Sequence, residues 1–313
     1  MIGLLLINLG TPDAPTEDAV HHYLTEFLSD PYVITLPAFL RHFLVKKIIL
    51  KKRPKKSAEA YQKIWTDQGS PLLINSLALR DALQQQNKNI SVALGMRYGN
   101  PSIISAIKEL QAQQCEKITV LPLFPQFSRA TSQSTIDAVY RAFSQLHYHP
   151  ELKIINDFHD HPIYIDSVAE SIAQEKKSDH FLLMSYHGLP KRHADSNCYR
   201  DQCYKTSQLL AEKLQLSPDA FSVSFQSRLG FAKWIGPYTD HVVRDLRKQG
   251  ITNLSVVCTS FVADCIETLE EINIRLRHQW LQLGGQSFQM ISCINERVSQ
   301  KSPSQYAPSY FLP

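Results

Sequence analysis

Eight short apolar runs, separated by longer amphipathic stretches, dominate this sequence of 313 residues. Each run is almost continuously apolar, which is typical of a strand buried on both faces of a parallel sheet. Between the runs, apolar residues recur at helical spacing, as in residues 102–113, 132–146, 201–214, 238–249 and 265–283. Strand and helix in regular alternation predict right-handed crossovers and a doubly wound α/β fold. The predicted strands are Gly3–Leu9, Ile90–Gly95, Lys117–Leu123, Leu152–Asn156, His180–Ser185, Phe221–Phe225, Leu254–Thr259 and Ser287–Ser292.

The predicted strands divide four and four around a polar, histidine-rich join at residues 145–149. The chain length suits two domains of about 150 residues each. We therefore expect two similar doubly wound domains, residues 1–147 and 148–313, each with a four-stranded, mainly parallel sheet flanked by helices. An active-site cleft is expected between them. Residues 31–57, apolar at first and then basic, predict a lip over this cleft, and three prolines within residues 302–313 indicate a tail or strap.

Charge and cysteine content narrow the classes of function. Seven basic and no acidic side chains fall within residues 46–56, so the net charge of +4 reflects a local patch. No nucleic-acid-binding motif accompanies this patch, which disfavours a nucleic-acid partner. The six cysteines show neither a CxxC pair nor zinc-finger spacing, and we expect free thiols. The N-terminal residues lack the features of a signal peptide and no apolar run could span a bilayer, which predicts a cytoplasmic protein.

Polar residues follow several predicted strands at their carboxyl ends, where open α/β sheets carry their chemistry. His187 lies just after the fifth predicted strand and is followed by Gly188 and Pro190, which keep a helix from starting there and leave the ring at the mouth of the sheet. Histidine is the side chain that titrates most readily near neutral pH. Taken alone, however, a histidine at this place is more often a hydrogen-bonded structural residue.

Acidic residues gather where the last long helix is predicted to begin. Asp264, Glu267 and Glu271 fall at spacings of three and four, which places them on one face of an α-helix. The helix dipole alone accounts for acids near a helix N-terminus. If this face borders the cleft, the row of carboxylates is also a path for a hard divalent cation.

Nine segments, in order along the chain, together resemble the ferrochelatase family, most closely its cytoplasmic bacterial type. The N-terminal half contains INLGTP (7–12), KSAEAYQKIW (56–65), GSPL (69–72), MRYGNP (96–101) and LPLFPQFS (121–128). The C-terminal half contains LLMSYHGLP (182–190), FQSRLG (225–230), KWIGPYTD (233–240) and FVADCIETLEEI (261–272). They span most of the chain, and so many ordered matches make chance similarity very improbable.

The resemblance implies a chelatase-like fold and the insertion of Fe²⁺ into protoporphyrin IX, which forms protohaem. It implies that His187 and Glu267 are catalytic and bind the metal together with Glu271, while Asp264 and Glu271 belong to an acidic path. Which of His187 and Glu267 ligates the metal and which accepts a proton stays open. Porphyrin metallation requires a distorted macrocycle and the loss of two pyrrole protons. The expected porphyrin-binding residues are Leu9, Arg97, Tyr98, Gln126, Ser128, Gln226, Ser227 and Trp234.

Three departures from the family pattern are visible. The run Ser196-Asn197-Cys198-Tyr199 stands where Gly-Asp-x-Tyr is frequent, and Cys265 stands where other branches have histidine. Arg129 stands where members with an iron–sulfur cluster have a cysteine, and no cysteine follows Cys293. We therefore expect no iron–sulfur cluster and no permanently bound cofactor, with Fe²⁺ acting as a substrate.

Several alternatives remain at this stage. A coproporphyrin III ferrochelatase or a cobalt chelatase would keep the fold, and a non-enzymatic haem- or metal-binding protein of two lobes is a different class. The basic run beside apolar residues in 36–56 suits peripheral contact with the inner face of a membrane. It could equally guide an acidic substrate or simply solvate a loop.

Overall fold

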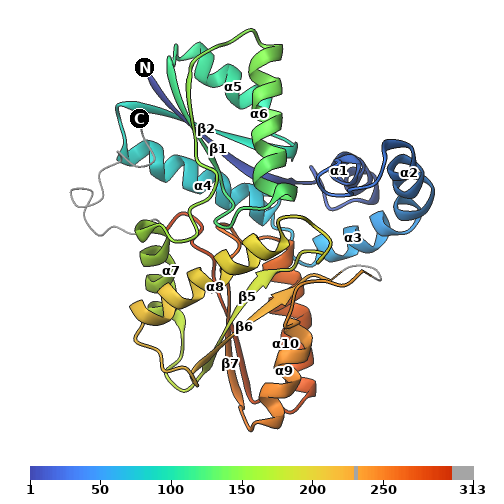
Figure 1. Ribbon diagram of the computed structural model, residues 1–313, viewed down its shortest axis with the longest axis vertical. Coiled ribbons are helices and arrows are strands. Elements are labelled where there is room, and N and C mark those ends of the chain that lie inside the picture. The colour runs from blue at the N-terminus through green and yellow to red at the C-terminus, as the bar shows by residue number, and fades with distance from the viewer. Residues whose placement is uncertain (229–231, 298–313) are drawn as a thin grey trace. The chain divides into compact units, whose positions relative to one another are not determined.

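The computed structural model describes residues 1–228 and 232–297, and the chain forms two compact units (Figure 1). The first unit comprises residues 1–124 and 128–157, and the second comprises residues 125–127 together with 158–297. The short stretch 125–127 thus belongs to the second unit although the chain on both sides of it belongs to the first. The sequence-based boundary lay at residue 147, whereas the first unit extends to Asp157 because its last strand follows that point. The predicted tail at 302–313 lies outside the described residues.

The first unit is built on a four-stranded parallel sheet of order β2-β1-β3-β4. In register, Ile2 lies opposite Ile90 on one side and Lys117 on the other. Side chains alternate between the faces of a strand. Ile7 packs in a core cluster with α5 and α6, so Asn8, which binds Ser76 of α4, faces the opposite layer. The strands are β1 (Ile2–Thr11), β2 (Ile90–Gly99), β3 (Lys117–Pro122) and β4 (Glu151–Ile154), and the helices just named are α4 (Pro71–Gln86), α5 (Ile103–Ala112) and α6 (Ser134–Gln145).

The second unit repeats this plan with a four-stranded parallel sheet of order β6-β5-β7-β8. One face packs on helices α9 and α10 through a core that includes Leu183, Val243 and Trp280. On the other face, Tyr186 reaches Ser207 of α8. The elements are β5 (Phe181–His187), β6 (Phe221–Gln226), β7 (Asn253–Cys258), β8 (Ser287–Ile291), α7 (Pro162–Glu175), α8 (Ser196–Lys213), α9 (Thr239–Lys248) and α10 (Arg277–Gln282).

The fold prediction is confirmed: all eight predicted strands are present, in two four-stranded parallel sheets flanked by helices. The segment predicted as one α-helix over 265–283 has a different helix type over most of its length. It consists of a π-helix, η4 (Glu267–Leu276), continued by α10. A π-helix of this length is rare, and π-helical turns are frequent at functional sites. Asp264 precedes it, so the α-helical spacing assumed for Asp264, Glu267 and Glu271 does not apply.

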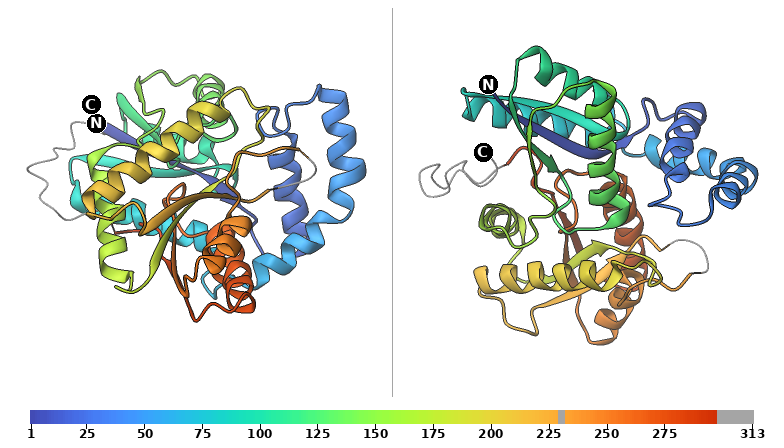
Figure 2. Two further views of the ribbon diagram at one scale, coloured as in Figure 1. Left: turned by 60° about the horizontal axis from the view of Figure 1, so that its bottom comes forward. Right: turned by 45° about the horizontal axis from the view of Figure 1, so that its top comes forward.

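The predicted insertion at 31–57 is a group of short helices that extends to one side of the first sheet (Figure 2). Several large apolar side chains in it are exposed, among them Phe39, Leu40, Phe43 and Ile48. From residue 44 onward the insertion packs on α1, where Val45 and Leu50 are buried. The elements here are α1 (Glu17–Ser29), α2 (Ala38–Phe43), the π-helical η1 (Leu44–Ile48), the 3₁₀ turn η2 (Ile49–Lys51) and α3 (Arg53–Gln62).

Candidate active site

His187 is the last residue of β5, and its backbone is held on both sides. Its N–H donates to Ser260 Oγ at 2.9 Å, and the Tyr199 hydroxyl donates to its carbonyl oxygen at 2.8 Å. The ring Nδ1 lies 2.7 Å from the carbonyl oxygen of Gly188. Because a carbonyl oxygen only accepts, Nδ1 must carry the proton in the neutral ring. The lone pair of a neutral His187 is therefore on Nε2, which is the atom left for chemistry.

Gly188 permits a close approach that no other residue could make. Its N–H donates to the carbonyl oxygen of Gln226 at 2.9 Å, and a Cβ at Gly188 would lie 2.8 Å from that same oxygen. The same Cβ would lie 3.3 Å from the ring of Trp234. The indole thus packs directly beside the residue that follows His187, which fixes the turn that orients the histidine ring.

Glu267 is the first residue of η4, and its position depends on Gln226. The side-chain amide of Gln226 donates to the carbonyl oxygen of Glu267 at 2.9 Å, and its own oxygen accepts from Ser185 Oγ at 2.7 Å. Gln226 is 3% exposed. The structure therefore places Gln226 as an internal brace between two strands and the π-helix, with both ends of its amide already bonded.

Glu271 is clamped by Ser227, the residue that follows β6. The Ser227 N–H and hydroxyl donate to the two carboxylate oxygens of Glu271 at 2.8 and 2.6 Å. Ser227 has a φ of +67°, a left-handed conformation that is uncommon for serine. The two bonds to one carboxylate offset the cost of that conformation. Glu271 thus already has donors on both oxygens in this state.

Asp264 lies apart from the Glu267–Glu271 row in its bonding. Its carboxylate accepts from the Thr268 hydroxyl and from the Asn295 amide, each at 2.9 Å, and the side chain is buried. These contacts tie the start of η4 to the segment after β8. Across residues 1–228 and 232–297, no three His, Cys, Asp or Glu side chains lie close enough together to hold a metal ion. His187, Glu267 and Glu271 accordingly do not form a ready-made three-ligand site in this state.

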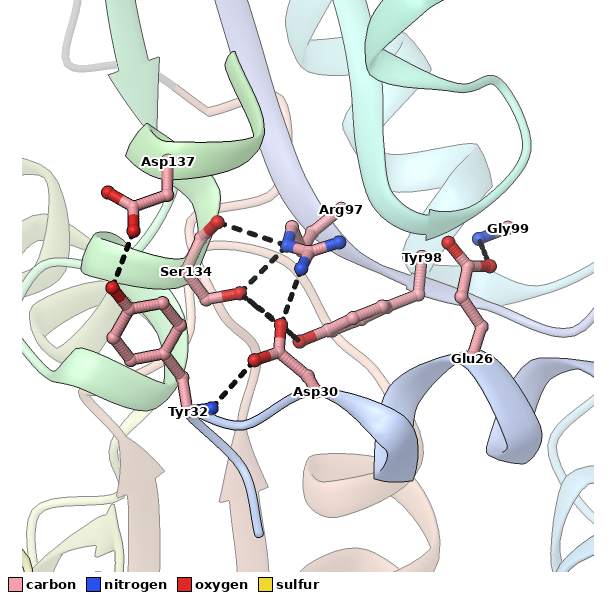
Figure 3. A network of polar contacts seen from close by, with 8 residues as sticks. All are labelled: Glu26, Asp30, Tyr32, Arg97, Tyr98, Gly99, Ser134 and Asp137. Carbon is pink, nitrogen blue, oxygen red and sulfur yellow. Dashed lines mark hydrogen bonds and ion pairs between the residues drawn. The ribbon is translucent and has the colours of Figure 1, made fainter. Parts of the chain in front are cut away.

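Arg97 and Tyr98, at the carboxyl end of β2, meet the buried carboxylate of Asp30 (Figure 3). Asp30 accepts from the Arg97 guanidinium, from the Tyr98 hydroxyl at 2.8 Å and from the Ser134 hydroxyl at 2.6 Å. Burial raises the pKa of Tyr98 far above its usual value. Burial also acts to raise the pKa of Asp30, but the bonds from Ser134, Tyr32, Tyr98 and Arg97 outweigh it and lower that pKa. Tyr98 stays protonated and Asp30 ionised, so the pair is a permanent donor and acceptor.

This network fixes the base of the 31–57 insertion. Asp30 follows the last residue of α1, accepts from the Tyr32 N–H at 2.7 Å, and is bonded to β2 and to the start of α6. The Tyr32 hydroxyl donates to Asp137 of α6 at 2.5 Å (Figure 3). Asp30 and Ser134 were not predicted from the sequence. No local pattern marks an aspartate whose partners lie 67 and 104 residues further along the chain.

The three remaining residues predicted to contact the porphyrin, Leu9, Gln126 and Ser128, differ in how far they are buried. Leu9, near the end of β1, is partly exposed. Ser128 is buried, and its hydroxyl lies 3.0 Å from that of Thr131. Gln126 is buried in the second unit, where its amide donates to the Thr206 hydroxyl at 3.1 Å and to the carbonyl oxygen of Thr259 at 3.2 Å.

Two further expectations concern the cysteines and the Ser196–Tyr199 run. All six cysteines are free thiols, five of them buried, as predicted. Ser196 is the first residue of α8 and has a helical backbone conformation, which does not require glycine. Tyr199, quoted in the sequence only as part of this run, is the residue that bonds the His187 carbonyl. In the described ranges, no helix has both the length and the hydrophobicity that crossing a bilayer requires.

A sequence model of the ferrochelatase family matches residues 1–300 of the chain. The chain belongs to the ferrochelatase family. A ferrochelatase of Coxiella burnetii (strain Dugway 5J108-111) is 48% identical over 320 residues, which cover 94% of this chain and 89% of the relative. A ferrochelatase of Legionella pneumophila (strain Paris) is 47% identical over 314 residues, which cover 94% of each chain. The resemblance inferred from the nine segments is thereby confirmed.

Solved structures support the fold at much lower sequence identity. SirB from Bacillus subtilis with Fe³⁺ aligns with a TM-score of 0.56 and 12% identity, covering 98% of both chains. CbiX, described as the terminal enzyme for biosynthesis of siroheme in denitrifying bacteria, aligns with a TM-score of 0.50 and 14% identity, covering 98% of this chain and 97% of its own. At such identity the likeness concerns the fold alone, which this ferrochelatase-family chain shares with other chelatases.

Proposed function

We propose that this chain inserts Fe²⁺ into protoporphyrin IX to form protohaem, the last step of haem biosynthesis. Membership in the ferrochelatase family carries the reaction class, a lyase that inserts iron into a porphyrin for haem synthesis. The proposal adds the porphyrin and the residues that act. The observation that carries the choice of residues is the bond from His187 Nδ1 to the Gly188 carbonyl, because it directs the Nε2 lone pair away from the backbone.

In the proposed mechanism, two pyrrole N–H protons leave the macrocycle as Fe²⁺ enters. His187 Nε2 supplies the lone pair that a pyrrole proton or the metal requires, and Glu267 supplies a carboxylate in the same role. Binding energy along the faces of the porphyrin holds the macrocycle in a bent shape that turns its nitrogens toward the metal. Glu271, one turn further along η4, is proposed to take part in metal transfer once its bonds to Ser227 open.

The proposed porphyrin contacts fall into two groups. Leu9 and Ser227 are partly exposed, and we propose that they touch the macrocycle, together with Trp234, which is buried beside Gly188. The other five expected residues are buried or hydrogen-bonded internally, and they act by holding neighbouring backbone in place. These five are Arg97, Tyr98, Gln126, Ser128 and Gln226.

The proposal includes no resident cofactor and no iron–sulfur cluster. Cluster ligation needs cysteine thiolates. In residues 1–228 and 232–297, no three His, Cys, Asp or Glu side chains lie close enough together to hold a metal ion, which supports this part of the proposal. Inorganic sulfide found together with iron in anaerobically purified protein would contradict this part of the proposal.

We also propose that the chain works in the cytoplasm and touches the inner face of the membrane through residues 36–56. The specific observation is the exposure of Phe39, Phe43 and Ile48, at 73%, 59% and 56%, within ten residues of one another. The basic run 46–56 overlaps this apolar surface. Apolar insertion beside cationic side chains is the combination that anionic lipid surfaces bind, and porphyrins partition into membranes.

An anaerobic assay of the purified protein with Fe²⁺ and either protoporphyrin IX or coproporphyrin III tests the proposal, with haem formation followed by absorbance. Turnover of protoporphyrin IX that is lost in His187→Ala would support both substrate and site. Turnover of coproporphyrin III alone would keep the enzyme class and replace the substrate. Porphyrin binding by folded protein without metal insertion would overturn the enzymatic assignment.

A further inference from the structure

A cavity of about 240 Å³ in the second unit lies at the outer end of the Glu267–Glu271 row. Its polar lining includes Glu271 and Ser227 together with Arg228, Asp240, Arg275 and Gln279. An open end to a row of carboxylates would be a natural entrance for a divalent cation. The arginine side chains that line this cavity instead disfavour the entry of a cation.

Arg275 lies one turn beyond Glu271 on η4 and forms ion pairs with Glu270 and Glu271. Its Nε lies 2.7 Å from Glu270 Oε2, and its Nη2 lies 3.8 Å from Glu271 Oε2. The arginine side chain is 59% exposed, whereas the side chains of Glu270 and Glu271 are 6% and 21% exposed. The guanidinium therefore lies between these carboxylates and solvent.

A second paired cation, Arg228, also lines the cavity. Arg228 Nη2 donates to Asp240 Oδ2 at 2.8 Å, and its guanidinium lies 4.1 Å from the centre of the Tyr238 ring. Glu271 has a donor from Ser227 on each carboxylate oxygen. A divalent cation in this cavity would face two guanidinium groups, which stay charged at any physiological pH, in the same lining as Glu271.

We propose that Arg275 is a specificity-determining residue that closes the outer end of the Glu267–Glu271 row to free divalent cations. The inference rests on the proposed function and deepens it, since it concerns how iron reaches that site. Arg275 holds Glu270 and Glu271 as ion pairs and lowers their attraction for metal, so free Fe²⁺ does not enter through this cavity. Because Arg275 is largely exposed, salt weakens its effect without abolishing it.

Substitution of Arg275 separates this role from general charge effects. Arg275→Gln removes the cation and Arg275→Glu reverses it, while Arg277→Gln and Arg277→Glu are matched controls. Arg277 is exposed two residues away, bonds Asn273 and lies over Phe288. Binding of Mn²⁺ to porphyrin-free protein is measured by electron paramagnetic resonance, and the KM for Fe²⁺ is measured in the insertion assay.

We expect Mn²⁺ to bind about threefold more tightly to Arg275→Gln and about tenfold more tightly to Arg275→Glu, with the KM for Fe²⁺ falling in the same order. The Arg277 variants should match the unmodified chain. Adding Glu271→Gln to Arg275→Glu should remove the gain in Mn²⁺ affinity. Unchanged Mn²⁺ affinity in both folded Arg275 variants, or a gain that survives Glu271→Gln, would overturn the proposal.

The two proposals fail in different ways. If the unmodified chain does not insert iron, the proposed function is refuted, yet Mn²⁺ binding still reports on Arg275. If the chain inserts iron but the Arg275 variants bind Mn²⁺ like the unmodified chain, only the role of Arg275 is refuted. Circular dichroism confirms that each variant is folded before its binding is compared.

Discussion

The side-chain amide of Gln226 donates a hydrogen bond to the backbone carbonyl of Glu267, 2.9 Å away. Its oxygen accepts from Ser185 on the neighbouring strand, and Ser185 in turn lies 3.1 Å from the Thr239 hydroxyl of α9. One buried side chain therefore joins β5, β6 and the start of the π-helix. The position of the proposed catalytic glutamate depends on a residue that need not touch the substrate.

We expect Gln226→Leu to lower kcat for iron insertion by about tenfold, because the start of η4 loses its link to the sheet. Loss of the amide also leaves the Ser185 hydroxyl and the Glu267 carbonyl short of a partner, which costs about 1–3 kcal/mol of unfolding free energy. Steady-state kinetics and urea denaturation measure the two effects. Gln289→Leu is the control, because Gln289 braces β8 through the Glu175 carbonyl at 2.7 Å. Equal losses of kcat in the two variants would contradict a specific role for Gln226.

His187→Ala should abolish iron insertion, with kcat reduced at least about a hundredfold, while the protein stays folded. Folding is expected to persist because Ser260 and Tyr199 bond the backbone of residue 187, which alanine retains. Absorbance assays of haem formation and far-ultraviolet circular dichroism give the two readouts. His278→Ala, at an exposed position, should behave like the unmodified chain. Normal activity in His187→Ala would refute the site assignment.

Asp30→Asn should lower the unfolding free energy by about 3 kcal/mol at pH 7, because it leaves the Arg97 guanidinium without its buried partner. The pKa of Asp30 is lowered in the folded chain, so its ionised form stabilises the fold above the unfolded pKa of about 3.9. That contribution is lost as the pH falls through the folded pKa. The gap between the two proteins should therefore shrink below about pH 4.

Urea denaturation across this pH range measures that gap. Asp81→Asn is the control, because Asp81 is exposed and its pair with Arg80 contributes under about 1 kcal/mol. A gap between the unmodified chain and Asp30→Asn that does not change with pH would show that Asp30 acts by shape rather than by charge.

The double variant Phe39→Ser/Phe43→Ser should lose binding to vesicles that contain anionic lipid, measured by co-sedimentation. Binding of the unmodified chain should weaken at high salt, because the basic run 46–56 attracts the lipid headgroups electrostatically. Tyr140→Ser removes an exposed aromatic ring from α6 and should leave binding unchanged. If the unmodified chain fails to bind such vesicles at low salt, the membrane proposal is wrong.

The eight strands and the two-sheet plan could be read from the sequence because burial of a parallel strand is recorded locally, as a continuous apolar run. His187 and Glu267 could be proposed from strand ends and motif order. The π-helix could not, since the apolar spacing of residues 265–283 fits an α-helix equally well. The consequence is visible at Asp264, which precedes η4 and accepts hydrogen bonds from Thr268 and Asn295, while its place on the acidic path stays a prediction.

The sequence by itself determined which segments are strands, which family the chain resembles and which side chains end the strands. Only the tertiary structure decided which of those side chains form hydrogen bonds within the protein. Tyr98 and Gln226 look alike in the sequence as polar residues at strand ends, yet Tyr98 bonds Asp30 at the C-cap of α1 and Gln226 bonds the start of η4. The physical reason is that the order of strands in each sheet differs from their order in the chain. Partners of a buried polar group therefore come from distant segments that no local pattern identifies.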